Sequence, residues 1–200
     1  MLTATTFYFL RHGETDWNRN RLIQGQTDVP LNDLGLSQAE GVRAAVEALP
    51  IATICCSPLL RTRRTMEIVN RNINKPVVYV PELMEVGLGE IQGQASNGEW
   101  RAPWVKGELT PPGGETFLEY VARILRGVTH SLAQPGPVLM VGHGGNFWAL
   151  EHYGLVESGT RVSNCSLFRV DPPHDSQFWT VTQLACPEGP ALAIGEGVAP

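Results

Sequence analysis

The segment Phe7-Tyr8-Phe9-Leu10 is an apolar run of strand-forming residues that ends abruptly at Arg11-His12-Gly13. A run that is apolar at every position is typical of a strand buried on both faces of a sheet. In open α/β sheets, ligands bind at the carboxyl ends of the strands. An arginine, a histidine and a glycine at such an end provide a fixed positive charge, a nucleophile or base, and room for close approach. This combination indicates a site for a phosphate group.

Strand-like and helix-like segments alternate along the chain. Such alternation predicts an α/β protein of three layers, with a mostly parallel sheet and helices on both of its faces. The apolar residues of the first expected helix, among them Leu36, Ala39 and Val42, lie at helical spacing. We expect strands at about residues 5–10, 51–56, 77–80, 138–141, 166–170 and 178–184, and helices at about 36–49, 61–72, 116–132 and 146–153.

The 200 residues are enough for one ordinary domain with a sizeable core. We expect that domain to span residues 1–186 and to carry a loop-rich lid at about 87–114, where glycine and proline interrupt the strand and helix pattern. Residues 187–200 are rich in Gly, Ala and Pro and are expected to form an irregular tail. Within the lid, two tryptophans and two basic residues either contact the substrate or form a small packed loop. They are Trp100, Arg101, Trp104 and Lys106.

The charge balance excludes some partners. The net charge of −5 argues against binding of nucleic acid by the surface as a whole, so a local cluster of basic residues must hold any phosphate group. No segment approaches the roughly 20 consecutive apolar residues of a membrane span, and a signal peptide is not evident. The adjacent Cys55 and Cys56 lie in an apolar run and are expected to be core thiols. We therefore expect a cytoplasmic protein that binds neither nucleic acid nor membranes.

Three further strand-like segments, at 51–56, 77–80 and 138–141, also have chemically functional residues beyond their last apolar residue. If these strands lie parallel and side by side, their polar ends meet at one edge of the sheet. Two arginines, two histidines and a carboxylate would then share a cleft. They are Arg11, His12, Arg61, Glu85 and His143.

This set of residues suits phosphoryl transfer. Arginine offers two-point hydrogen bonding to phosphate oxygens, and a helix that begins after Gly144-Gly145 would add backbone N–H donors. A neutral histidine can attack phosphorus, while a protonated carboxylic acid supplies the proton that the leaving oxygen needs. Glu82 and Glu85 both lie just beyond Pro81, and either could be that acid. We expect no metal, because arginines close to the histidines would repel a cation.

These residues belong to an ordered set of motifs that resembles the histidine phosphatase superfamily, in its phosphoglycerate-mutase-like branch. One Arg-His-Gly tripeptide would be weak support, whereas the ordered set covers about residues 5–170. The motifs are Arg11-His12-Gly13-Glu14-Thr15, Trp17-Asn18, Gln24-Gly25, Leu31-Asn32-Asp33-Leu34-Gly35, Ser57-Pro58-Leu59-Leu60-Arg61, Leu83-Met84-Glu85, Pro112-Gly113-Gly114-Glu115-Thr116 and Val141-Gly142-His143-Gly144-Gly145.

The resemblance implies a phosphoglycerate-mutase-like fold and a covalent mechanism that uses no cofactor. His12 would attack phosphorus in line and become a phosphohistidine. Arg11, Arg61 and His143 would hold the phosphoryl oxygens. Glu85 would protonate the leaving oxygen and then deprotonate the attacking water. Four further residues would line the phosphate pocket: Asn18 and Gln24, and Gly25 and Gly144 through their backbone.

Residues 85–93 favour a phosphatase over a mutase, because they lack the Tyr-Gly-x-Leu-x-Gly-x-Asn-Lys-like stretch of the mutases. Gly87 and Ile91 depart from the commonest phosphatase form, which has an acidic residue and an aromatic residue there. We expect a phosphoric monoester hydrolase that acts on a small phosphorylated metabolite. The alternatives are a cofactor-dependent phosphoglycerate mutase and a weakly catalytic module that binds phosphorylated ligands. Dimers are frequent in the family, so a homodimer is compatible with the sequence.

Overall fold

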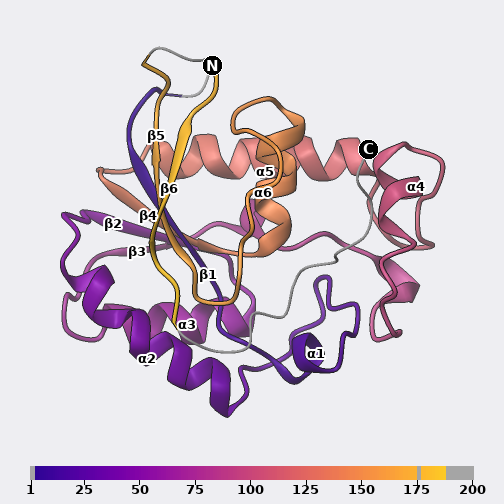
Figure 1. Cartoon of the computed structure of the whole chain (residues 1–200), viewed down its shortest axis with the longest axis horizontal. Coiled ribbons are helices and arrows are strands. Elements are labelled where there is room, and N and C mark those ends of the chain that lie inside the picture. Colours follow the sequence, from indigo (N-terminus) through magenta and orange to yellow (C-terminus); the bar gives the residue numbers. More distant parts are fainter. Residues whose placement is uncertain (1–2, 175–176, 188–200) are drawn as a thin grey trace.

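A six-stranded sheet is the middle layer of the computed structural model, which describes residues 3–174 and 177–187 (Figure 1). The three pairings among the first four strands of the sheet order are parallel, and the remaining two are antiparallel. The predicted α/β class with a mostly parallel sheet is therefore confirmed. In sheet order, the strands are β3 (Val77–Tyr79), β2 (Thr53–Cys56), β4 (Val138–Gly142), β1 (Phe7–Arg11), β5 (Leu167–Asp171) and β6 (Thr180–Ala185).

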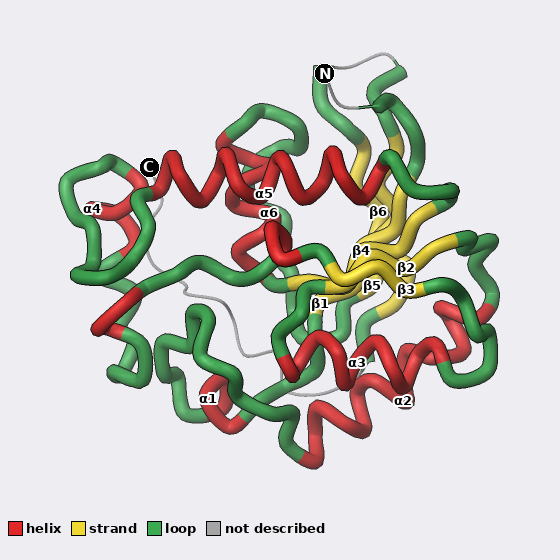
Figure 2. Tube along the Cα trace, turned by 180° about the vertical axis from the view of Figure 1, so that it is seen from behind, coloured by secondary structure: helices red, strands yellow, loops and turns green. Residues whose placement is uncertain are grey.

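Helices cover both faces of this sheet. Figures 1 and 2 show α2 and α3 on one side and α5 and α6 on the other. The first long helix begins three residues before the expected position, because the Asn32 side chain accepts a hydrogen bond from the Gly35 N–H and caps the helix there. Two short helices were not predicted, since four or five residues are too few to show a periodic pattern. The helices are α1 (Asp16–Arg19), α2 (Asp33–Glu47), α3 (Leu60–Asn70), α4 (Arg101–Val105), α5 (Phe117–Leu132) and α6 (Gly144–His152), with 3₁₀ turns at Pro81–Leu83 and Gly89–Ile91.

The central strand β1 explains the apolar run that opens the chain. Phe7 and Phe9 pack in the core on the side of α5 and α6, whereas Tyr8 and Leu10 pack on the side of α2 and α3. Successive side chains of a strand point to opposite faces, so a strand covered on both faces needs apolar residues at every position.

Strand register determines which residues meet at the carboxyl edge of the sheet. Arg11 pairs with Gly142 between β1 and β4, and Cys56 pairs with Val141 between β2 and β4. The next residue of each strand therefore emerges beside its neighbours. The polar residues that follow the three strands are brought together in this way.

The predicted lid at 87–114 is anchored in the core. Leu88 and Gly114 form a bridge that joins its two ends. Trp104 of α4 is fully buried, with ring contacts to Phe117 and Tyr120 of α5. Trp104 is therefore part of the hydrophobic core on the side of α5 and α6.

Beyond Pro187, the predicted tail lies outside the described residues. Within the described ranges, no helix combines the length and the apolar character that a bilayer crossing requires.

Candidate active site

His12 follows β1 directly and is almost completely buried. Its Nδ1 lies 2.7 Å from the carbonyl oxygen of Gly13. Because a carbonyl oxygen can only accept, the neutral ring carries its hydrogen on Nδ1, which leaves the lone pair on Nε2. Burial lowers the pKa of His12 well below its usual value, and the neighbouring Arg61 and Arg11 lower it further. The ring is therefore neutral, as a nucleophile must be.

His143 follows β4 and lies beside His12, with the ring centroids 5.2 Å apart. Its Nε2 is 2.8 Å from the hydroxyl oxygen of Ser57, the residue that follows β2. Burial, together with the charge of Arg61, lowers the pKa of His143 well below the usual range. His12, His143 and Ser57 follow β1, β4 and β2, so the ends of these three strands bring them into one polar cluster.

Two buried arginines contribute the positive charge of the cluster. Arg11 donates from Nη1 to the carbonyl of Val162 at 2.7 Å. Arg61, in the first turn of α3, donates to the carbonyls of Thr27 and Gly25 at 2.9 and 2.7 Å. Burial lowers the pKa of each guanidinium to about 10, so both remain protonated at neutral pH.

Several nitrogens of this cluster have no protein partner. In the described part of the chain, four buried side-chain atoms lack a hydrogen bond, and three of them are Arg11 Nε, Arg61 Nε and His143 Nδ1. Leaving a buried donor unpaired is costly, so such atoms call for a ligand or an ordered water. Two guanidinium donors and an imidazole nitrogen suit the oxygens of a bound oxyanion.

Glu85 completes the cluster from the segment that follows β3. Its carboxylate accepts hydrogen bonds from the Tyr120 hydroxyl at 3.1 Å, from the Val86 N–H at 3.0 Å and from the Gly145 N–H at 3.3 Å. Burial raises the pKa of Tyr120 well above its usual value, so the phenol remains a donor. A Cβ on Gly145 would collide with Glu85 Oε1 and would lie only 2.7 Å from the Tyr120 hydroxyl. Because Gly145 has no side chain, the Glu85 carboxylate has room at this position.

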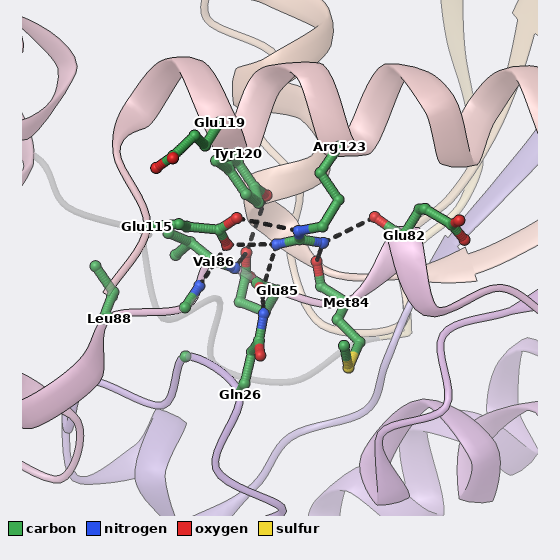
Figure 3. Close-up of polar contacts among 12 residues, drawn as sticks. Gln26, Glu82, Met84, Glu85, Val86, Leu88, Glu115, Glu119, Tyr120 and Arg123 are labelled. Carbon is green, nitrogen blue, oxygen red and sulfur yellow. Dashed lines mark hydrogen bonds and ion pairs between the residues drawn. The ribbon is translucent and has the colours of Figure 1, made fainter. Parts of the chain in front are cut away.

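The electrostatics connect Glu85 to the same cluster. Attraction by the Glu85 carboxylate partly offsets the lowering of the pKa that burial causes in Arg11 and Arg61. Figure 3 shows the carboxyl group of Glu82, the other candidate acid, pointing away from Glu85. Of the two candidate acids, Glu85 is therefore the one shown to contact this cluster, through the Gly145 N–H.

The remaining predicted residues surround this cluster. The hydroxyl of Thr15, the residue that caps α1, donates to the side-chain oxygens of Asn18 and Gln24. The backbone of Gly25 takes a positive φ of 51° and holds Arg61 through its carbonyl. Gly144 is the first residue of α6, so its N–H lies at a helix N-terminus. Their roles as phosphate ligands stay predictions.

Among the residues described, no group of three or more His, Cys, Asp or Glu side chains could hold a metal ion.

Three contributors to the cluster were not predicted as site residues. Ser57 follows the strand segment 51–56 as His12 follows the first strand, so a signal was present. Tyr120 occupies a buried position of α5 and looks like a core residue in the sequence. Asn164 donates to the carbonyl of His12 at 3.1 Å, and nothing near it in the sequence indicates that contact.

Comparison with known proteins agrees with the geometry. The family model for the histidine phosphatase superfamily (branch 1) matches residues 7–185. A protein of Proteus mirabilis named probable phosphoglycerate mutase GpmB is 34% identical over 181 residues, which are 82% of this chain and 83% of that protein. The protein of the same name from Cronobacter sakazakii is 36% identical over 182 residues, with the same coverage of both chains.

Solved structures of a phosphatase and of a mutase share the fold of this chain. A mycobacterial glucosyl-3-phosphoglycerate phosphatase in complex with VO3 superposes with a TM-score of 0.74 at 26% identity, over 90% of this chain and 98% of that one. A phosphoglycerate mutase from Thermus thermophilus gives a TM-score of 0.71 at 29% identity, with the same coverage.

Proposed function

The chain belongs to branch 1 of the histidine phosphatase superfamily, and from that membership we propose that it is a phosphoric monoester hydrolase. Its substrate would be a small-molecule phosphate ester, cleaved through a phosphohistidine on His12. The observation that carries the proposal is the set of three buried, unpartnered nitrogens beside a neutral histidine. They are Arg11 Nε, Arg61 Nε and His143 Nδ1.

In the first step, Nε2 of His12 attacks phosphorus while the two guanidinium groups and His143 hold the non-bridging oxygens. The P–N bond forms as the P–O ester bond breaks, and the charge that develops on the oxygens is stabilised by donors already in place. This step requires Glu85 to carry a proton, which it gives to the leaving oxygen, so the product departs as an alcohol.

In the second step, a water molecule attacks the phosphohistidine. Glu85, now a carboxylate, takes a proton from that water. The P–N bond breaks, inorganic phosphate leaves, and His12 returns to its neutral form. The carboxyl group returns to its starting state, so the cycle needs no external proton donor.

The experiment that tests this proposal measures the release of inorganic phosphate from a panel of phosphate monoesters in the presence of a chelator. Wild type should turn over, and His12→Ala should lose at least about 1000-fold in kcat, because no other residue of the cluster can replace the nucleophile. Residual activity in His12→Ala close to that of wild type would overturn the assignment. Loss of wild-type activity in chelator would instead indicate a metal-dependent reaction.

The names of the relatives favour a second candidate, a phosphoglycerate mutase. A mutase must shield its phosphohistidine from water and return the phosphoryl group to the bound substrate. The test is interconversion of phosphoglycerate isomers with and without a bisphosphorylated primer. Isomerisation that depends on the primer, with little release of phosphate, would replace hydrolase by mutase as the assignment.

A further inference from the structure

Arg123 of α5 is held by an unusually complete set of hydrogen bonds (Figure 3). A guanidinium group has five N–H donors, and each of them has an acceptor here. Three hydrogen bonds go to the backbone carbonyls of Glu82, Met84 and Glu85, at 2.8, 2.8 and 3.0 Å. The other two go to the carboxylate of Glu115. The side chain therefore ties α5 to the segment that carries the predicted proton donor.

Glu115 holds the same segment from its other end. While it pairs with Arg123, its Oε1 also accepts the backbone N–H of Gly87 at 2.6 Å, and its own N–H donates to the Gly87 carbonyl at 2.8 Å. Both side chains of the ion pair are mostly buried, at 15% and 17% exposure. The ion pair thus forms hydrogen bonds with the backbone on both sides of Glu85, and its described hydrogen bonds do not include the Glu85 carboxylate.

The same helix, α5, also contacts the carboxylate of Glu85. Tyr120 lies three residues before Arg123, on the same face of the helix, and donates its hydroxyl to Glu85 Oε1. One helix therefore contacts both the backbone and the side chain of Glu85.

Resting on the function proposed above, we infer that Arg123 and Glu115 are positioning residues for the proton donor. They act by fixing the backbone of residues 82–87, so that the Glu85 carboxyl group reaches the leaving oxygen. Proton transfer needs heavy atoms within about 3 Å, and a displacement of about 1 Å in a catalytic group can cost about 100-fold in rate.

The inference is tested with two substrates that differ in leaving group. An alkyl phosphate releases a strongly basic oxygen that needs the proton, whereas 4-nitrophenyl phosphate releases a weakly basic one. In Arg123→Lys, which keeps the charge but loses the fork of donors, kcat/KM should fall about 10- to 100-fold for the alkyl phosphate. For 4-nitrophenyl phosphate it should fall less than about 3-fold. Glu115→Gln should show the same selectivity.

A double-mutant cycle separates positioning from loss of folded protein. In a Glu85→Gln background, Arg123→Lys should cost nothing further in kcat/KM, because its effect passes through Glu85. The matched control is Arg43→Lys on α2, where the arginine pairs with Glu40 and Glu47 and activity should match that of wild type.

Equal losses on both substrates, additive losses in the cycle, or no loss in either variant of the ion pair would each overturn the inference. Failure of wild type to hydrolyse any ester would overturn the proposed function itself, so the two failures are distinct.

Discussion

His12 and His143 lie side by side at the carboxyl ends of two neighbouring parallel strands, with their ring centroids 5.2 Å apart. The preceding residues, Arg11 and Gly142, are paired in register, so the two histidines leave the sheet at the same level. Each histidine then forms a different hydrogen bond, one to a backbone carbonyl and the other to the hydroxyl of Ser57. In the proposed reaction, the two rings have different tasks, attack on phosphorus and stabilisation of its oxygens.

Gly145→Ala should reduce activity strongly. The new methyl group would occupy the place of Glu85 Oε1 and press on the Tyr120 hydroxyl, so the carboxyl group must move. We expect a loss of about 100-fold in kcat/KM for an alkyl phosphate. The control is Gly41→Ala on α2, where the added methyl would only make an ordinary contact with Pro187. Activity of Gly145→Ala within about 3-fold of wild type would contradict this account of the glycine.

Ser57→Ala should weaken the binding of inorganic phosphate. Without the hydroxyl, Nε2 of His143 loses its partner and the ring is no longer held in one orientation. The inhibition constant for inorganic phosphate should rise about 5- to 10-fold, as expected for the loss of one buried hydrogen bond. Ser131→Ala is the matched control, since that buried hydroxyl donates to the Gly127 carbonyl within α5. A similar rise in both variants would show that the effect is not specific to the site.

The folded protein should lose stability below about pH 6.5 in buffer that contains no phosphate. His12 and His143 are held neutral in the folded state, because burial lowers the pKa of each. The unfolded chain takes up protons at these residues as the pH falls through about 6.5, so the free energy of unfolding decreases. Each histidine contributes about 1.4 kcal/mol per pH unit well below that value, and nothing above it.

Urea unfolding between about pH 7.5 and 5.5, a range that spans the ordinary histidine pKa, measures this dependence. A variant with both histidines replaced by asparagine should show a shallower decline than wild type as the pH is lowered. The comparison concerns the slopes, so a change in overall stability does not affect it. Identical slopes would mean that neither histidine is held neutral.

Trp104→Ala should destabilise the whole fold, and not the segment 87–114 alone. The indole is fully buried against α5 and donates from its N–H to the carbonyl of Glu115 at 2.9 Å. Removing it should lower the free energy of unfolding by about 3 to 5 kcal/mol. Leu118→Ala, on the exposed face of the same helix, should change it by less than about 0.5 kcal/mol. If the two variants unfold alike, the segment that contains α4 is not part of the core.

The pattern of residues along the chain was enough to predict the fold class and the set of side chains that meet at the sheet edge. Strands buried on both faces must be apolar at every position, so the point where polarity begins marks the carboxyl end of each strand. His12 and His143 could therefore be placed at that edge from the sequence pattern. The family resemblance supplied Glu85 as the acid, a choice that the local spacing left open with Glu82.

Packing in three dimensions was needed to establish which groups hold these residues. The order of strands and their register depend on pairings between distant segments, which no local pattern encodes. Tyr120 and Trp104 are both buried aromatic residues, and only packing distinguishes the one that donates to Glu85 from the one that anchors α4. The grip of Arg123 on backbone carbonyls is equally invisible in sequence, because every residue has a carbonyl and only the fold brings particular ones within reach of a guanidinium group.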